Sequence, residues 1–163
     1  EKADHLRDLV AECLPEAVSL DFIRDFVFWE KVYPDRTPDS LPQTCFCPIC
    51  LERFSKETGI DLPVGLGETS VIAHWILDIH RDEWTAWKCG IIARAAETLA
   101  AAARRSKPDV LVNVHAVPWR RNDFGGAART VAGQDAARLS RVADFLSPMA
   151  YHHMVLRTPA WVP

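Results

Sequence analysis

The alternation of apolar and polar positions divides the chain into helical and extended segments. Residues 2–14 carry apolar side chains at helical spacing, and Pro15, which disfavours the helical conformation in the residue before it, follows them. Residues 16–23 are short, apolar and bounded, which is typical of a buried parallel strand. Residues 110–117 form the clearest strand pattern of the chain, and residues 145–151 form another. The pattern therefore predicts three strands.

Helical patterns separate these strands. Residues 49–58 predict a short helix that Gly59 ends. Residues 70–105 keep one apolar face for longer than an ordinary globular helix, so we expect a break near residues 80–83. Residues 134–142 predict a further helix. Because strands and helices alternate, the predicted fold class is α/β with a parallel sheet.

Composition narrows the class of protein. The chain has 163 residues, 48% of them hydrophobic, which is enough for one domain with its own core. A net charge of −3 and isolated Arg-Arg pairs exclude a nucleic-acid-binding surface. No apolar run reaches the roughly 18 to 20 residues of a membrane-spanning helix, so we expect a soluble chain, cytoplasmic or secreted, with no membrane partner. The sequence leaves open whether the chain forms a homo-oligomer.

The two ends predict a fragment. The first residues lie inside a helical pattern, and Trp161-Val162-Pro163 closes no element. We therefore expect residues 1–163 to form a single domain that is part of a larger one. Residues 34–69, rich in Pro, Asp, Ser and Thr at their start, form an inserted loop in this interpretation.

Polar residues gather towards the C-terminal end of each predicted strand, where parallel sheets and barrels form their ligand sites. The two-residue period groups Ser19 with Asp21, Asn113 with His115, and Ser147 with Tyr151, followed by His152. Such groups are costly in a core unless they face a cavity or find hydrogen-bond partners. We therefore expect a cleft lined by Asp21, Asn113, His115 and Tyr151.

Asp21 is the leading catalytic candidate. A carboxylate at a barrel strand end can act as nucleophile, proton shuttle or cation stabiliser at a glycosidic bond. In this interpretation Arg24 orients Asp21; in the alternative, an ion pair between them only holds the strand end in place. Asp123 and Glu30 lie in loops expected at the same face and are candidates for a second carboxylate.

The predicted substrate contacts are aromatic and polar. His115 either binds a sugar hydroxyl or a developing charge, or is a core histidine bonded to a carbonyl. Trp119 and Trp29 follow strands, where an aromatic ring can stack on a sugar. The full predicted set is Arg24, Trp29, Asn113, His115, Trp119, Tyr151 and His152.

Three of the five cysteines form a cluster in the sequence. The spacing of Cys45, Cys47 and Cys50 lets three thiolates converge on one tetrahedral metal ion. A fourth ligand comes from His80, from Cys89 or from outside the chain. Structural zinc is one interpretation, and reduced thiols or a disulfide are the other. No organic cofactor is expected.

Four stretches of the chain resemble bacterial glycoside-hydrolase-like TIM barrels, the hypothetical glycosyl hydrolases. They are Ser19–Arg24, Thr44–Phe54 with Gly59 after it, Val117–Gly125 and Ser147–His152. The cysteine segment is similar to the zinc-binding loop of family 42 β-galactosidases. The resemblance implies the central part of a (β/α)8 barrel that acts on a carbohydrate, with Asp21 at the end of about the fourth strand. Family 42 enzymes carry an Asn-Glu pair at that strand end, where this chain has Leu20-Asp21.

Three functions follow as hypotheses. The first is a glycoside hydrolase with its site at the C-terminal face of the barrel. The second is a non-catalytic carbohydrate-binding barrel that has kept the cleft and lost one acid. The third is a metal-stabilised scaffold whose cysteines serve assembly.

Overall fold

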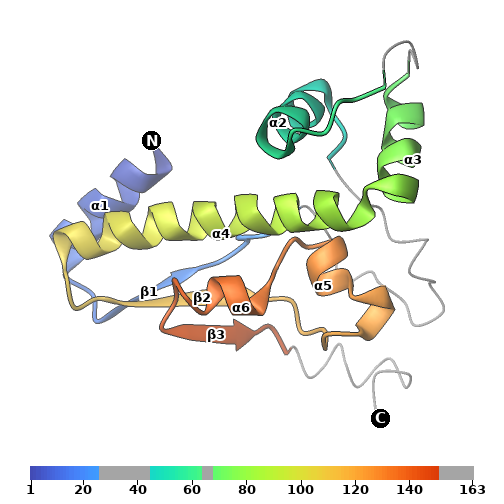
Figure 1. Cartoon of the computed structure of the whole chain (residues 1–163). Helices are drawn as coiled ribbons and strands as arrows, with labels where there is room; N and C mark the ends of the chain where they lie inside the picture. The colour runs from blue at the N-terminus through green and yellow to red at the C-terminus, as the bar shows by residue number, and fades with distance from the viewer. Residues whose placement is uncertain (26–44, 64–67, 151–163) are drawn as a thin grey trace.

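A computed structural model describes residues 1–25, 45–63 and 68–150 (Figure 1). In chain order the elements are α1 Lys2–Cys13, β1 Ala17–Leu20, α2 Pro48–Thr58, α3 Thr69–Ile79, α4 Arg81–Ser106, β2 Leu111–Ala116, the short 3-10 helix η3 Asp123–Gly125, α5 Ala127–Thr130, α6 Ala136–Leu139 and β3 Phe145–Pro148. The three strands are parallel, in the order β1-β2-β3. The α/β class is therefore confirmed. None of the helices within these ranges is long and apolar enough to cross a lipid bilayer.

One face of the sheet is covered by helices. Val112 and Val114 of β2 are both 0% exposed and pack with Leu20 of β1 against α4 and α6. Figure 1 shows α4 running along the length of the strands. Leu111, which points to the opposite face, is 42% exposed. The alternation along β2 thus separates an apolar, covered face from a face that is open within the described residues.

The long helical region breaks where the sequence predicts. His80 has φ −123° and ψ 30°, so it ends α3 and precedes α4. In α4, Ala96 and Ala100 are almost fully buried against the sheet, because a methyl group lets the helix approach closely. Val10 of α1 packs on Ala103 further along α4. Helix α4 is therefore the main support of both the sheet and α1.

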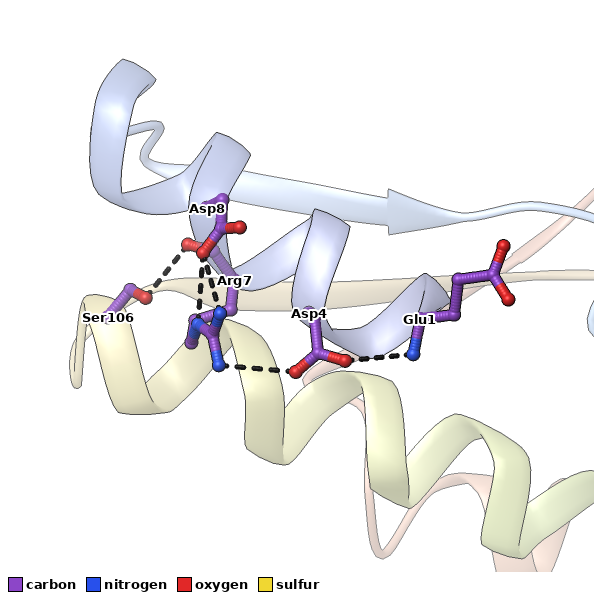
Figure 2. A network of polar contacts seen from close by, with 5 residues as sticks. All are labelled: Glu1, Asp4, Arg7, Asp8 and Ser106. Carbon is purple, nitrogen blue, oxygen red and sulfur yellow. Dashed lines mark hydrogen bonds and ion pairs between the residues drawn. The ribbon is translucent and has the colours of Figure 1, made fainter.

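A polar network lies where α1 meets the C-terminal end of α4 (Figure 2). The hydroxyl of Ser106 donates to the carbonyl of Arg7 at 2.9 Å. The guanidinium of Arg7 contacts Asp4 and Asp8, and Asp4 also accepts from the amino group of Glu1. These charges are exposed and screened by solvent, so they contribute little stability.

Two predicted strands are longer than the observed ones. The first is predicted over residues 16–23, whereas β1 ends at Leu20, and Phe22 beyond it has a φ of +54° that leaves the extended conformation. The third is predicted over residues 145–151, whereas β3 ends at Pro148. The N–H of Met149 still donates to the carbonyl of Ala116 at 2.9 Å, so one hydrogen bond to β2 extends past that boundary.

The region between β2 and β3 also differs from the prediction. The predicted helix over residues 134–142 is shorter in the structure, where α6 spans Ala136–Leu139. The helices η3 and α5 precede it, where the sequence predicts a loop. They lie around Phe124, which has a φ of +51°, so the segment carries no helical period that the sequence could reveal.

Candidate functional site

Three polar side chains form a row across the open face of the sheet. The amide nitrogen of Asn113 donates to the hydroxyl of Ser19 at 3.1 Å. The hydroxyl of Ser147 donates to the amide oxygen of Asn113 at 2.8 Å. The row therefore joins all three strands by side chains, and its polar atoms satisfy one another.

Asp21 and His115 lie beyond this row, at the C-terminal ends of β1 and β2. Asp21 is exposed, and its Oδ1 accepts from the backbone N–H of Phe22 at 2.7 Å. His115 is half-buried and is the register partner of Ser147. The guanidinium of Arg24 lies 5.0 Å from the ring centroid of Phe22. Among the described ion pairs, none joins Asp21 to Arg24.

Gln134 ties the exits of β1 and β2 together. Its side chain is buried, with the residue 4% exposed. Its Oε1 accepts from the N–H of Val117 at 2.8 Å, and its Nε2 donates to the carbonyls of Ile23 and His115, each at 3.0 Å. One amide thus replaces the ladder hydrogen bonds that β1 loses after Leu20, and it positions the backbone beside Asp21 and His115.

We predict that Gln134→Leu lowers the free energy of unfolding by about 2 kcal/mol, because three backbone groups lose their buried partner. Urea denaturation followed by tryptophan fluorescence measures the change. Ser140→Ala, at an exposed hydroxyl of the following turn, serves as the control and is expected to change stability by less than about 0.5 kcal/mol. Equal stability of Gln134→Leu and the parent would show that solvent replaces the amide.

A buried ion pair lies behind the same strand end. The ammonium of Lys88 on α4 is 3.0 Å from Oδ2 of Asp25, and the lysine side chain is 3% exposed. The N–H of Asp25 donates to the carbonyl of Ala132 at 2.9 Å. A Cβ built on Gly133 would lie 2.9 Å from Cγ1 of Ile92, so the backbone approaches α4 here as only glycine allows. The segment after β1 is therefore fixed to both α4 and the loop before α6.

Two other predicted site residues have structural surroundings. Oδ2 of Asp123 accepts from the N–H of Arg120 at 2.7 Å and closes the turn after β2. Trp119 is 7% exposed and packs edge to face on Phe124, with ring centroids 5.7 Å apart. It also lines a hollow of about 430 Å³ together with Gln134. Roles for Asp123 in catalysis and for Trp119 in sugar stacking stay predictions.

Four predicted residues lie outside the described part of the chain. They are Trp29, Glu30, Tyr151 and His152. Of the predicted cleft, the structure places Asn113 and His115 on β2 and Asp21 just after the end of β1, three residues before Arg24.

The three clustered cysteines converge at the start of α2. The sulfur atoms of Cys45, Cys47 and Cys50 all lie within 4.8 Å of one another. Cys47 is the N-cap residue and Pro48 follows at the first helical position, where proline is favoured. Phe46 lies between Cys45 and Cys47 in the sequence. Its ring stacks on that of Trp84 of α4, with 4.6 Å between the ring centroids and 10° between the planes. The three thiols can together hold a metal ion.

The start of α2 also changes the acidity of these thiols. The pKa of Cys47 is lowered, chiefly by the backbone amide of Cys50, because the free N–H groups of a helix's first turn stabilise a thiolate. Burial raises the pKa of Cys50 to about 12. A metal ion would offset that desolvation, since a coordinating thiol is deprotonated by the ion itself.

Neither His80 nor Cys89, the described candidates for a fourth ligand, belongs to this group of thiols. Within the described ranges, the three thiols form this group by themselves. Cys89 is buried, and its thiol faces the carbonyl of Arg129 at 3.7 Å. The ring of His80 packs on Trp75, 4.7 Å away.

Sequence reasoning missed the residues that hold the strand ends in place. Ser19 and Ser147 are the exception, since the two-residue period groups both with the predicted site, although the predicted cleft does not include them. Gln134, Lys88 and Asp25 gave no such signal, because each acts through a partner distant in the sequence.

Comparisons of the chain with protein-family models, with curated proteins and with solved structures find no match. The candidate site is therefore defined by its own residues.

Proposed function

We propose that the chain is the central part of a (β/α)8 barrel and that its open sheet face belongs to a carbohydrate site of a glycoside hydrolase. The observation that carries this proposal is the division of the sheet into two unlike faces. Doubly wound sheets bury both faces in helices and are apolar on both. Here one face is apolar and covered. The other presents the row Ser19, Asn113 and Ser147 next to the exposed side chains of Leu111 and Phe145, with Asp21 and His115 at its C-terminal end. A polar row of this kind suits the cleft of a barrel, where enzymes of this fold keep their active sites.

The exposed carboxylate of Asp21 is the proposed nucleophile or proton shuttle. A second carboxylate completes such chemistry, with a spacing of about 5 Å for retention and roughly 6.5 to 9.5 Å for inversion. His115, at the neighbouring strand end, is the proposed partner of a sugar hydroxyl. Asn113 is proposed to form the floor of the cleft, since its side chain is hydrogen-bonded on both sides to serines.

A second function is carbohydrate binding without catalysis. It is favoured because the other carboxylates near this end of the sheet already have partners within the protein. Asp25 is paired with Lys88, and Asp123 is bonded to the N–H of Arg120. Both are thus engaged in holding the fold. In the part of the chain that the structure describes, Asp21 is the strand-end carboxylate that remains available for substrate.

A panel of aryl glycosides, assayed beside binding of the matching free sugars, separates the two functions. Hydrolysis of any member supports the hydrolase. Sugar binding without hydrolysis by the intact protein supports the binding function. Absence of both would remove carbohydrate as the ligand class.

We also infer that the three thiols bind a structural zinc ion with a ligand from outside the described residues. A donor set of cysteine sulfurs at this spacing is typical of closed zinc sites. Phe46 anchors the cluster on Trp84, and the carboxylate of Glu57 near the other end of α2 accepts from Trp87 at 3.0 Å. The ion would therefore brace a helix that is already docked on α4.

We predict about one equivalent of zinc per chain in protein purified without chelators, and its loss in Cys47→Ser. Because α2 keeps its packing on α4, the expected loss of stability is moderate, about 2 kcal/mol, or roughly 5 °C in Tm. Mass spectrometry of the metal and thermal unfolding measure the two effects. Cys13→Ser, at an exposed thiol of α1, is the control and should retain the zinc. Metal-free protein of unchanged Tm would contradict the inference.

A further inference from the structure

A second hollow lies on the helical side of the sheet, between α2, α4 and α6. Its volume is about 590 Å³, and its lining includes Glu57, Glu83, Gly90, Arg94 and Arg138. These residues belong to α4 and α6, which cover the apolar face, and to α2, which packs on α4, away from the open face of the sheet. The hollow is therefore separate from the proposed carbohydrate site.

Two arginines converge on one point of this hollow. A Cβ built on Gly90 would lie 3.0 Å from Nη1 of Arg138 and 3.3 Å from Nη1 of Arg94. The absence of a side chain at Gly90 thus makes room for both guanidinium groups. Nη1 of Arg138 also donates to the carbonyl of Ala86 at 3.2 Å, which holds that guanidinium against α4.

The carboxylates of the hollow contact groups other than the guanidinium of Arg138. Oε2 of Glu57 accepts from Nη2 of Arg94 at 2.8 Å, and Oε1 pairs with Arg53 at 3.0 Å. Glu83 lies 3.8 Å from Nδ1 of His80. Among the ion pairs of the described residues, none includes Arg138. Two cations that approach the same point repel each other unless an anion lies between them.

We propose that this hollow binds a tetrahedral oxyanion, a phosphate or sulfate group, between Arg94 and Arg138. The planar guanidinium fork matches such oxygens in bidentate geometry, and charge-assisted hydrogen bonds are the stronger kind. Gly90 provides the space, Glu57 orients Arg94, and the Ala86 carbonyl orients Arg138. The group is either free or carried by a small phosphorylated molecule.

Titration of the intact protein with sodium phosphate, sodium sulfate and glycerol phosphate, against sodium chloride at equal ionic strength, tests the proposal by calorimetry. Saturable binding is expected for the oxyanions. Arg138→Gln is expected to weaken it by about tenfold, the effect of losing one charge-assisted contact. Arg141→Gln, at an exposed arginine of the adjoining turn, removes the same net charge and should change binding less than about twofold. Tighter binding of glycerol phosphate than of phosphate would identify a carried group, and equal binding a free ion.

Gly90→Ala keeps every charge and adds a methyl group where the two guanidinium groups meet. It should weaken binding even if Arg138→Gln impairs folding. No saturable binding to the parent protein would overturn the proposal. Equal weakening in Arg138→Gln and Arg141→Gln, or full binding by Gly90→Ala, would overturn it as well.

Discussion

Asp21→Asn is expected to lower the hydrolysis of the best aryl glycoside by about 10²- to 10⁴-fold, the usual contribution of a carboxylate that transfers a proton or attacks. Asparagine has nearly the same size, and its Oδ1 can still accept from the N–H of Phe22. The substitution therefore removes the charge and the titrating oxygen and leaves the turn intact. The measurement is kcat/KM from release of the phenolate, together with binding of the free sugar, which should persist.

Asp109→Asn is the matched control for this prediction. Asp109 is an exposed aspartate just before β2, at the N-terminal end of the central strand, where it pairs with Lys107 at 2.9 Å. Its loss should leave kcat/KM within about twofold, because a distant exposed charge is screened. Full turnover by Asp21→Asn would exclude Asp21 from the chemistry. A protein that binds sugar and hydrolyses no substrate would favour the second function.

The elements that sequence predicts best are those whose residues follow one period over a long distance. The strand over residues 110–117 corresponds to β2, since its valines alternate with residues of the open face. The break near residues 80–83 was predictable because the apolar face is too long for one ordinary helix, and His80 marks it in the structure. Gly59 ends α2 with a φ of +74°, as its position predicts. Periodicity and helix-ending residues thus account for most of the fold.

Prediction of the site was more limited, because strand ends depend on contacts across the fold. The two-residue period places Asn113 on the open face, where it joins Ser19 and Ser147. It extended the first strand too far, because the side chain of Gln134 takes over the carbonyl of Ile23. That bond spans more than a hundred residues, and no local pattern indicates it. The same holds for the ion pair between Lys88 and Asp25.

Lys88→Met is expected to lower the free energy of unfolding by about 3 kcal/mol, the lower part of the range for breaking a buried pair. Methionine retains the volume of the lysine stem, so packing inside α4 changes little. The carboxylate of Asp25 then loses the ammonium at 3.0 Å, although its side chain, 26% exposed, keeps some hydration. Urea denaturation measures the change, and kcat/KM should fall with it if the segment after β1 shifts.

The double variant Asp25→Asn with Lys88→Met separates electrostatics from packing. A neutral pair no longer contains an uncompensated charge, so the double variant should recover at least half of the stability lost in Lys88→Met. The substitution at Asp25 leaves its backbone N–H unchanged. That N–H donates to the carbonyl of Ala132, so the attachment of this segment to the loop before α6 is preserved. If the double variant is no more stable than Lys88→Met, packing of the lysine stem governs the effect. If it recovers stability and still turns over substrate, the ion pair serves the fold, and the chemistry depends on the strand-end residues in front of it.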